Sequence, residues 1–177
     1  MEGWTGRGDV KRLIVIMGVS GCGKTTVGRA LASRMAWPFI EADDHHSEAN
    51  RMRMAAGVAL TDADRAEWVD AMVAAVRACE DETVVLACSA LTEFVQSGLR
   101  TSGRAVTWCL LTASPTVIGA AMAKRDHFMP VDLLDSQFGA LDPPADAKVF
   151  AAHRPVEQIV EEIVVALNRP SVRLPPD

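Results

Sequence analysis

Short apolar runs and longer segments of helical periodicity alternate along this chain. A short, wholly apolar run is typical of a strand that is buried on both faces of a parallel sheet, and residues 13–17 form such a run. Between the runs, apolar residues recur every three or four positions, as on one face of a helix, most regularly over 155–167. The predicted strands cover 13–17, 37–42, 83–87, 105–111 and 148–151.

Start and stop signals mark several of the helices. Ser114-Pro115 places a capping residue before a proline at the first helical position, and Thr61 with Asp64 forms a variant of the capping box. Gly57 is a stop signal for the short helix before it. The predicted helices cover 27–35, 47–57, 61–79, 114–124, 131–141 and 155–167.

Strands that alternate with helices predict an α/β fold with a parallel sheet and right-handed crossovers. At 177 residues the chain suits one domain, which we place at 11–169. Residues 1–10 are rich in glycine and polar groups, and residues 170–177 contain three prolines. We therefore expect flexible tails at both ends of the chain.

The residues that follow the first strand form a complete phosphate-binding motif. The sequence GVSGCGKT from Gly18 to Thr25 fits G-x-x-x-x-G-K-[ST]. Its glycines let successive N–H groups wrap a phosphate, and the positive end of the next helix points at the anion. Lys24 would reach the β- and γ-phosphates, and the Thr25 hydroxyl would bind Mg²⁺. The alternative, a glycine-rich turn that precedes Lys-Thr by chance, is much less favoured. The predicted nucleotide-binding residues are Gly18, Val19, Ser20, Gly21, Cys22, Gly23, Lys24, Thr25 and Thr26.

Composition and charge narrow the classes of partner. The chain is 49% hydrophobic and 23% charged, as ordinary globular proteins are, and its net charge is −5. An acidic balance disfavours sequence-independent binding of nucleic acid, so phosphate must be bound by local groups. The four cysteines match no zinc or redox spacing. We expect free thiols in a cytoplasmic protein, with no signal peptide and no membrane span.

Polar side chains gather where the second and third strands end. Ligands in open α/β sheets bind beyond the carboxyl ends of the strands, so Asp43 or His46 in the polar run 43–46 is expected to face a substrate. A solvated turn is the alternative, and protein-ligated zinc is least favoured because adjacent residues do not readily converge on one ion. Ser89 would contact substrate or Mg²⁺-bound water, or else cap the next helix. Arg65 begins a helix where an acidic residue would be preferred.

These motifs together resemble the small bacterial-type gluconokinases, which belong to the nucleoside-monophosphate-kinase-like P-loop group, with shikimate kinase as a cousin. The resemblance covers about 13–165 and includes H-x-x-x-N at 46–50, L-x-D-x-D-R-x-x-W at 60–68, C-S-A-L at 88–91, H-F at 127–128 and Q-F at 137–138. It implies ATP-dependent phosphorylation of the 6-hydroxyl of D-gluconate, with Mg²⁺, in a dimeric cytoplasmic enzyme. It also implies a three-layer fold with a five-stranded parallel sheet in the order 2-3-1-4-5, a helical substrate arm at about 46–78 and a lid at about 120–135.

The resemblance also implies roles for particular residues. Lys24 would neutralise phosphate oxygens, and Asp43 would orient or deprotonate the attacking hydroxyl. A guanidinium suits a carboxylate because two N–H groups can bind it at once, and a closed lid would exclude water. The implied substrate-binding residues are Asp43, His46, Arg53, Arg65, Ser89 and His127, and the implied lid cations near the nucleotide are Lys124 and Arg125.

Several positions depart from the family pattern, and some of them lose a cation. The departures are Ala42 for glycine, Arg53 for lysine, Thr92-Glu93 for basic residues, Val95-Gln96 for Tyr-Arg, and Ala120 and Lys124 for the two lid arginines. Fewer cations would stabilise the transition-state charge less well. Two alternatives therefore stay open. One is a kinase for another small hydroxy acid, shikimate-like or another aldonate, and the other is a nucleotide-binding regulator with weakened catalysis.

Overall fold

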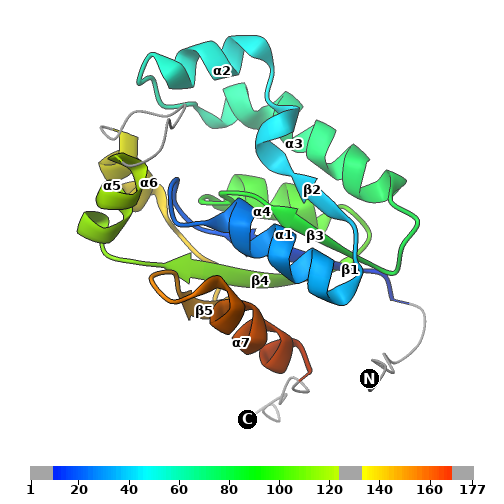
Figure 1. Cartoon of the computed structure of the whole chain (residues 1–177). Helices are drawn as coiled ribbons and strands as arrows, with labels where there is room; N and C mark the ends of the chain where they lie inside the picture. The colour runs from blue at the N-terminus through cyan, green and yellow to red at the C-terminus, as the bar shows by residue number, and fades with distance from the viewer. Residues whose placement is uncertain (1–9, 124–132, 169–177) are drawn as a thin grey trace, which may run out of the picture.

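The computed structural model describes residues 10–123 and 133–168, which form a parallel sheet between layers of helices (Figure 1). The strands are β1 (Arg12–Met17), β2 (Phe39–Glu41), β3 (Thr83–Ala87), β4 (Ala105–Thr112) and β5 (Lys148–Ala151). The helices are α1 (Lys24–Met35), α2 (Glu48–Ala55), α3 (Asp62–Ala78), α4 (Glu93–Arg100), α5 (Pro115–Ala123), α6 (Leu133–Ala140) and α7 (Val156–Asn168). No helix in these described ranges is long and apolar enough to cross a membrane.

The sheet has the order β2-β3-β1-β4-β5, and its paired strands run parallel. This order confirms the predicted order 2-3-1-4-5 and the predicted α/β class. β1 lies at the centre, where Ile14 pairs with Val85 of β3 and with Thr107 of β4. Because neighbours cover it on every side, residues 13–17 are fully buried, as the apolar run predicts.

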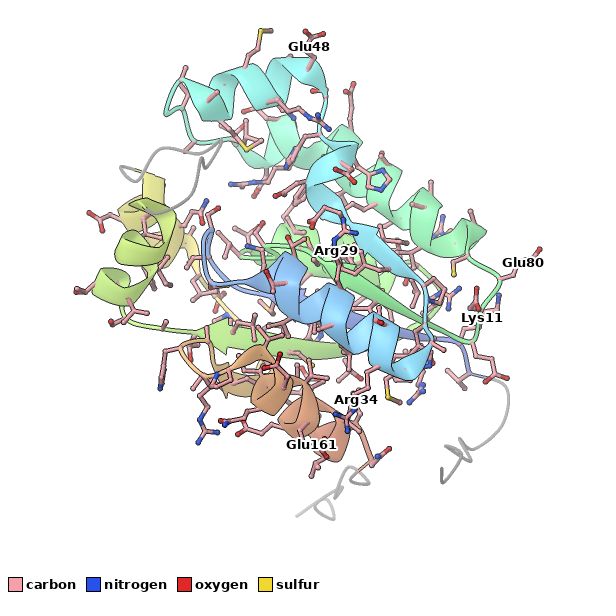
Figure 2. All side chains as sticks on the ribbon, viewed as in Figure 1. Lys11, Arg29, Arg34, Glu48, Glu80 and Glu161 are labelled. Atoms are coloured by element: carbon pink, nitrogen blue, oxygen red, sulfur yellow. The ribbon has the colours of Figure 1, made fainter. Side chains whose placement is uncertain are left out.

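Two hydrophobic clusters lie on the two faces of the sheet. On one face, Ile14 and Ile16 belong to a cluster with Leu31 of α1 and Ile159 and Ile163 of α7. On the other face, residues 13, 15 and 17 belong to a cluster with buried residues of α3 and α4. The alternation along β1 follows the two-residue period of a strand, and it produces the three layers. Figure 2 shows Arg34 of α1 beside Glu161 of α7, with which it forms an ion pair.

The segment from 36 to 46 differs from the prediction of one strand over 37–42. Ala36 adopts a left-handed conformation (φ 54°) that ends α1, and Trp37 N–H then donates to the Ala32 carbonyl at 2.9 Å. Trp37 therefore completes the end of the helix and does not start the strand. β2 is only Phe39–Glu41, and a short 3₁₀ helix (Ala42–His45) follows it. The polar run thus lies on a tight turn at the carboxyl end of β2.

The predicted signals at Gly57 and at Thr61 with Asp64 act as expected, and Ser47 provides a cap that was not predicted. The Ser47 hydroxyl accepts from Asn50 N–H at 3.3 Å at the start of α2, and Gly57 has a φ of 76° after that helix. Thr61 and Asp64 form a complete capping box at the start of α3. α6 lies within the predicted range 131–141. Most of the predicted lid, residues 124–132, and nearly all of the two predicted tails lie outside the described residues.

Candidate active site

The loop between β1 and α1 needs glycine for a steric reason at its first position. Gly18 has a φ of 139°, and a Cβ there would lie 2.6 Å from the Leu111 carbonyl oxygen. Gly23, at the N-cap of α1, also has a positive φ, of 96°. The Gly18 N–H donates to the Ser89 carbonyl at 3.3 Å, which ties the loop to the end of β3. The loop therefore has one conformation that a side chain at position 18 would prevent.

The start of α1 provides the positive end of an anion site. The helix begins at Lys24, and its N-cap residue offers no side-chain hydrogen bond, so the first N–H groups face the loop without a side-chain cap. Lys24 Nζ donates to the Val19 carbonyl at 3.0 Å and so lies across the loop. Cys22 is buried, and burial raises the pKa of its thiol. Backbone donors and an ammonium group together suit a phosphate.

A carboxylate that the sequence analysis missed lies beside Thr25. The Thr25 hydroxyl donates to Glu41 Oε2 at 2.7 Å, and Glu41 is the last residue of β2. Partial burial raises the pKa of Glu41, an effect that the hydrogen bond from Thr25 opposes. A carboxylate and a hydroxyl are the oxygen ligands that Mg²⁺ prefers, so these two side chains fit the ion. No group of three His, Cys, Asp or Glu side chains within 10–123 and 133–168 could hold a metal by itself.

Contacts from α2 and α3 fix the turn that carries Asp43. Trp68 Nε1 of α3 donates to the Ala42 carbonyl at 2.7 Å. The Arg51 guanidinium of α2 donates to the Asp44 carbonyl at 2.9 Å and to the Asp43 carbonyl at 3.3 Å. These contacts bind backbone carbonyls, so they hold the turn without using the Asp43 carboxylate. Asp43 lines a cleft that Lys24 of the phosphate-binding loop also lines.

His46 stacks on Trp68, with ring centroids 4.3 Å apart and an interplanar angle of 9°. Its Nδ1 atom is buried and has no hydrogen-bond partner within the described part of the chain. Burial lowers the pKa of His46, although the Asp43 carboxylate acts in the opposite direction. His46 lines the same cleft as Asp43.

The two arginines that were expected to bind substrate lie in different places. Arg65 lines the cleft, and its Nη1 donates to Asp62 Oδ1 at 2.8 Å, so Asp62 orients it. Arg53 does not line the cleft, and it pairs with Asp64 at 3.1 Å. Hydrogen bonds from Thr61, more than this pair, lower the pKa of Asp64. The structure therefore brings only one of the two guanidinium groups to the cleft.

The cleft contains about 660 Å³ of empty space, a volume that includes open solvent at its mouth. Its apolar lining residues include Leu60, Trp68 and Leu91. Ser89 lines the cleft and does not cap α4, because Thr92 is the N-cap residue of that helix. The polar residues that the cleft brings together include Ser20, Lys24, Asp43, His46, Arg65 and Ser89. The predicted site residues Lys124, Arg125 and His127 lie outside the described residues.

A second residue that sequence reasoning did not assign is Gln137 of α6. It lines the cleft and bonds to Ser20 of the loop, with Ser20 N–H donating to Gln137 Oε1 at 2.6 Å. Its only signal in the sequence is the Gln-Phe pair at 137–138, which carries no chemistry by itself.

The sheet order, the loop after the central strand and the cleft beyond the strand ends define a P-loop kinase. The family model for shikimate kinase matches residues 20–132. A gluconokinase of Arabidopsis thaliana is 40% identical over 155 residues, covering 78% of this chain and 82% of the relative. A gluconokinase of Gluconobacter oxydans (strain 621H) is 40% identical over 140 residues, covering 76% and 78%.

A solved structure agrees with these relatives. The crystal structure of a gluconokinase from Sinorhizobium meliloti 1021 has a TM-score of 0.79 and 36% identity, and the match covers 89% of this chain and 92% of that one. The chain belongs to the gluconokinase family, and it is a small-molecule kinase that uses a nucleotide as donor.

Proposed function

We propose that the protein transfers the γ-phosphoryl group of ATP, with Mg²⁺, to the 6-hydroxyl of D-gluconate. The observation that carries this proposal is one cleft that joins Lys24 of the phosphate loop to Asp43 and Arg65. The relatives described as gluconokinases support the choice of acceptor. The homodimer and the cytoplasmic location that the family resemblance implies are part of the same proposal.

The donor side, which we define as β1, loop 18–23 and α1, would hold the triphosphate. The loop N–H groups and the Lys24 ammonium would bind and neutralise its oxygens. Thr25 and Glu41 would hold Mg²⁺ through oxygen atoms, which matches their contact at 2.7 Å. When bound, the ion supplies further neutralisation of phosphate charge.

The acceptor side, which we define as the turn 42–46, α2 and α3, would hold gluconate. The 6-hydroxyl oxygen would form a bond to the γ-phosphorus while the bond from that phosphorus to the bridging oxygen breaks. Asp43 would accept the hydroxyl proton, and ADP would leave. The products are then 6-phosphogluconate and ADP, with the released proton on the Asp43 carboxylate.

Arg65 is our choice for the gluconate carboxylate, because it is the guanidinium of the described residues that lines the cleft. His46, whose ring is stacked on Trp68 and lines the cleft, would bind a substrate hydroxyl. Ser89 would bind substrate from the end of β3. Arg53 would contribute only after leaving Asp64. Lys124, Arg125 and His127 are proposed from the family resemblance alone.

The test is a coupled assay of ADP release with a panel of acceptors that includes gluconate, other aldonates and shikimate. We expect gluconate to show the highest kcat/KM. A higher kcat/KM with shikimate would mean that the acceptor is shikimate-like, and the proposed roles of the donor side would stay the same. Tight ATP binding by calorimetry without turnover on any acceptor would instead indicate the regulator.

A further inference from the structure

Gln137 contacts the phosphate-binding loop through both ends of its side-chain amide. Ser20 N–H donates to Gln137 Oε1 at 2.6 Å, and Gln137 Nε2 donates to the Ser20 hydroxyl oxygen at 3.1 Å. The two residues are 117 positions apart, so the contact joins two distant parts of the chain. Figure 1 shows α6 beside the loop that follows β1.

α6 is itself held at its C-terminal end. Asp142, two residues beyond the helix, donates its N–H to the Leu91 carbonyl at 2.9 Å and accepts from Gln96 Nε2 at 2.8 Å. The same Gln96 nitrogen donates to the Ala90 carbonyl at 2.9 Å, and Gln96 is buried. Because these bonds tie the end of α6 to the segment after β3, the helix presents Gln137 to the loop from a fixed position.

Ser20 and Gln137, the two residues of this contact, both line the cleft. The loop is also fixed at Gly18, whose N–H donates to the Ser89 carbonyl, and at Cys22, whose side chain is buried. Ser20 lies between these two points. Gln137 therefore adds a hold on the part of the loop that faces the acceptor.

The contact between Gln137 and Ser20 lies close to the groups that would carry out phosphoryl transfer. Ser20 and Gln137 line the same cleft as Lys24 and Asp43, which places them where donor and acceptor meet. Phosphoryl transfer depends chiefly on positioning and on neutral or positive surroundings, and a displacement of about 1 Å can cost about 10²-fold in rate. A carboxamide can hold an N–H group in place without bringing negative charge against the phosphates.

We propose that Gln137 is a positioning residue for the phosphoryl transfer, which acts by holding Ser20 and the adjoining part of the loop in place. The inference rests on the proposed function, because the rate that it concerns is transfer to gluconate. Loss of the amide is expected to lower kcat about 10- to 100-fold. The KM for gluconate and the affinity for ADP are expected to stay within about threefold, because the groups that bind them are unchanged.

The first experiment compares Gln137→Leu with Gln158→Leu, a matched change at an exposed position on α7. We measure kcat, KM for gluconate, ADP affinity by calorimetry and the melting temperature. Only Gln137→Leu should lower kcat, and it should melt as Gln158→Leu does. An unchanged kcat would overturn the inference. A loss of ADP affinity as large as the loss of kcat would also overturn it, because that result would mean a general collapse of the loop.

A double-mutant cycle tests whether Gln137 acts through Ser20. Ser20→Ala removes the hydroxyl that accepts from Gln137 Nε2. If the two residues act as one unit, adding Ser20→Ala to Gln137→Leu should lower kcat by clearly less than the product of the two single effects. Two effects that simply multiply would contradict a role for the bond to the Ser20 hydroxyl, whereas the bond from Ser20 N–H, which this substitution keeps, is tested by hydrogen exchange.

Hydrogen exchange decides the inference without any turnover. Absence of gluconate phosphorylation by the wild-type protein would defeat the proposed function alone. In that case, exchange of the Ser20 amide is measured in the nucleotide-free protein, because that N–H donates to Gln137 Oε1. We expect exchange about tenfold faster in Gln137→Leu than in the wild type or Gln158→Leu. Equal exchange in all three would overturn the inference.

Discussion

The donor side of the cleft and helix α2 of the acceptor side are held in place by different forces. On the donor side, residues 13–17 are fully buried, and Gly18 has no space for a side chain. On the acceptor side, α2 buries only Asn50 and Met54, and Met52 is 62% exposed. The polar pair Arg53–Asp64 joins α2 to α3, whereas α3 itself packs on the sheet through buried residues such as Trp68 and Met72.

This difference indicates which residues of the site tolerate substitution. Partly exposed ion pairs are worth about 0–1 kcal/mol each, so the residues that form them can be exchanged without unfolding the protein. A buried strand and a glycine under steric constraint do not tolerate exchange. In the proposed function, the donor would therefore be set by the fold, whereas the acceptor would be set by a few side chains from the turn 42–46, α2 and α3.

The largest effect is expected from Lys24→Met, which tests whether the donor side carries the chemistry. Loss of a charge that neutralises the phosphates should lower kcat with gluconate by about 10³-fold, with the melting temperature unchanged. Lys11→Met, at an exposed position near the start of β1, is the control and should keep its activity. More than a tenth of wild-type kcat in Lys24→Met would show that this lysine is not required.

Gly18→Ala tests the steric constraint on the donor side. A Cβ 2.6 Å from the Leu111 oxygen forces the loop or β4 to move, so we expect a loss of about 3 kcal/mol or more in urea unfolding, together with loss of ATP binding. Gly57→Ala on the acceptor side has a positive φ but nothing within 4 Å of the added Cβ. Its cost should be about 1 kcal/mol. Equal costs at the two positions would contradict the contrast between the two sides.

Arg65→Ala should affect the acceptor and spare the donor. We expect KM for gluconate to rise about 10- to 100-fold, with KM for ATP within about twofold. Arg53→Ala removes the same charge from outside the cleft and should raise KM for gluconate by less than about threefold. If the two substitutions raise KM equally, Arg53 leaves Asp64 to bind the substrate.

The smallest effect concerns Glu41, where function and stability oppose each other. Burial raises the pKa of Glu41 above its value in the unfolded chain. The folded state then binds the proton more tightly, so this carboxylate costs stability as the pH rises from about 4.5 through the raised pKa. Glu41→Gln keeps an acceptor for Thr25 and should raise the melting temperature at pH 7.5 by about 1–3 °C.

The same variant should lose activity with MgATP, because a carboxylate ligand for Mg²⁺ is gone. The gain in melting temperature should vanish as the pH falls to about 4.5, where both states are protonated. Glu67→Gln, at an exposed position on α3, should show neither effect. A gain that persists at pH 4.5 would mean that the carboxylate charge is not its cause.

Features that depend on nearby residues could be predicted from the sequence. The strand before Gly18, the loop itself and the capping box at Thr61 all appear where the patterns place them. The sheet order came from the family resemblance, and the structure confirms it. The length of β2 was wrong, because the use of Trp37 to end α1 depends on backbone contacts that periodicity does not reveal.

Features that depend on contacts between distant elements could not be predicted. Gln137 contacts Ser20, which lies 117 positions earlier in the chain. No sequence pattern indicated the ion pair with Asp64 that holds the Arg53 guanidinium outside the cleft. Gln96 stands where the family pattern has arginine, and this difference was expected to remove a cation from near the phosphates. The structure shows it buried, with its amide donating to two carbonyls. That position holds the segment after β3 in place, and it does not line the cleft.

The measurement that tests the central claim most directly is ADP release by the wild-type protein with MgATP and gluconate, compared with shikimate and other aldonates. The cleft that joins Lys24, Asp43 and Arg65 predicts turnover with gluconate at a higher kcat/KM than with any other acceptor, and formation of 6-phosphogluconate in equal amount to ADP. No turnover with gluconate, under conditions where the protein binds ATP, would contradict the proposed function.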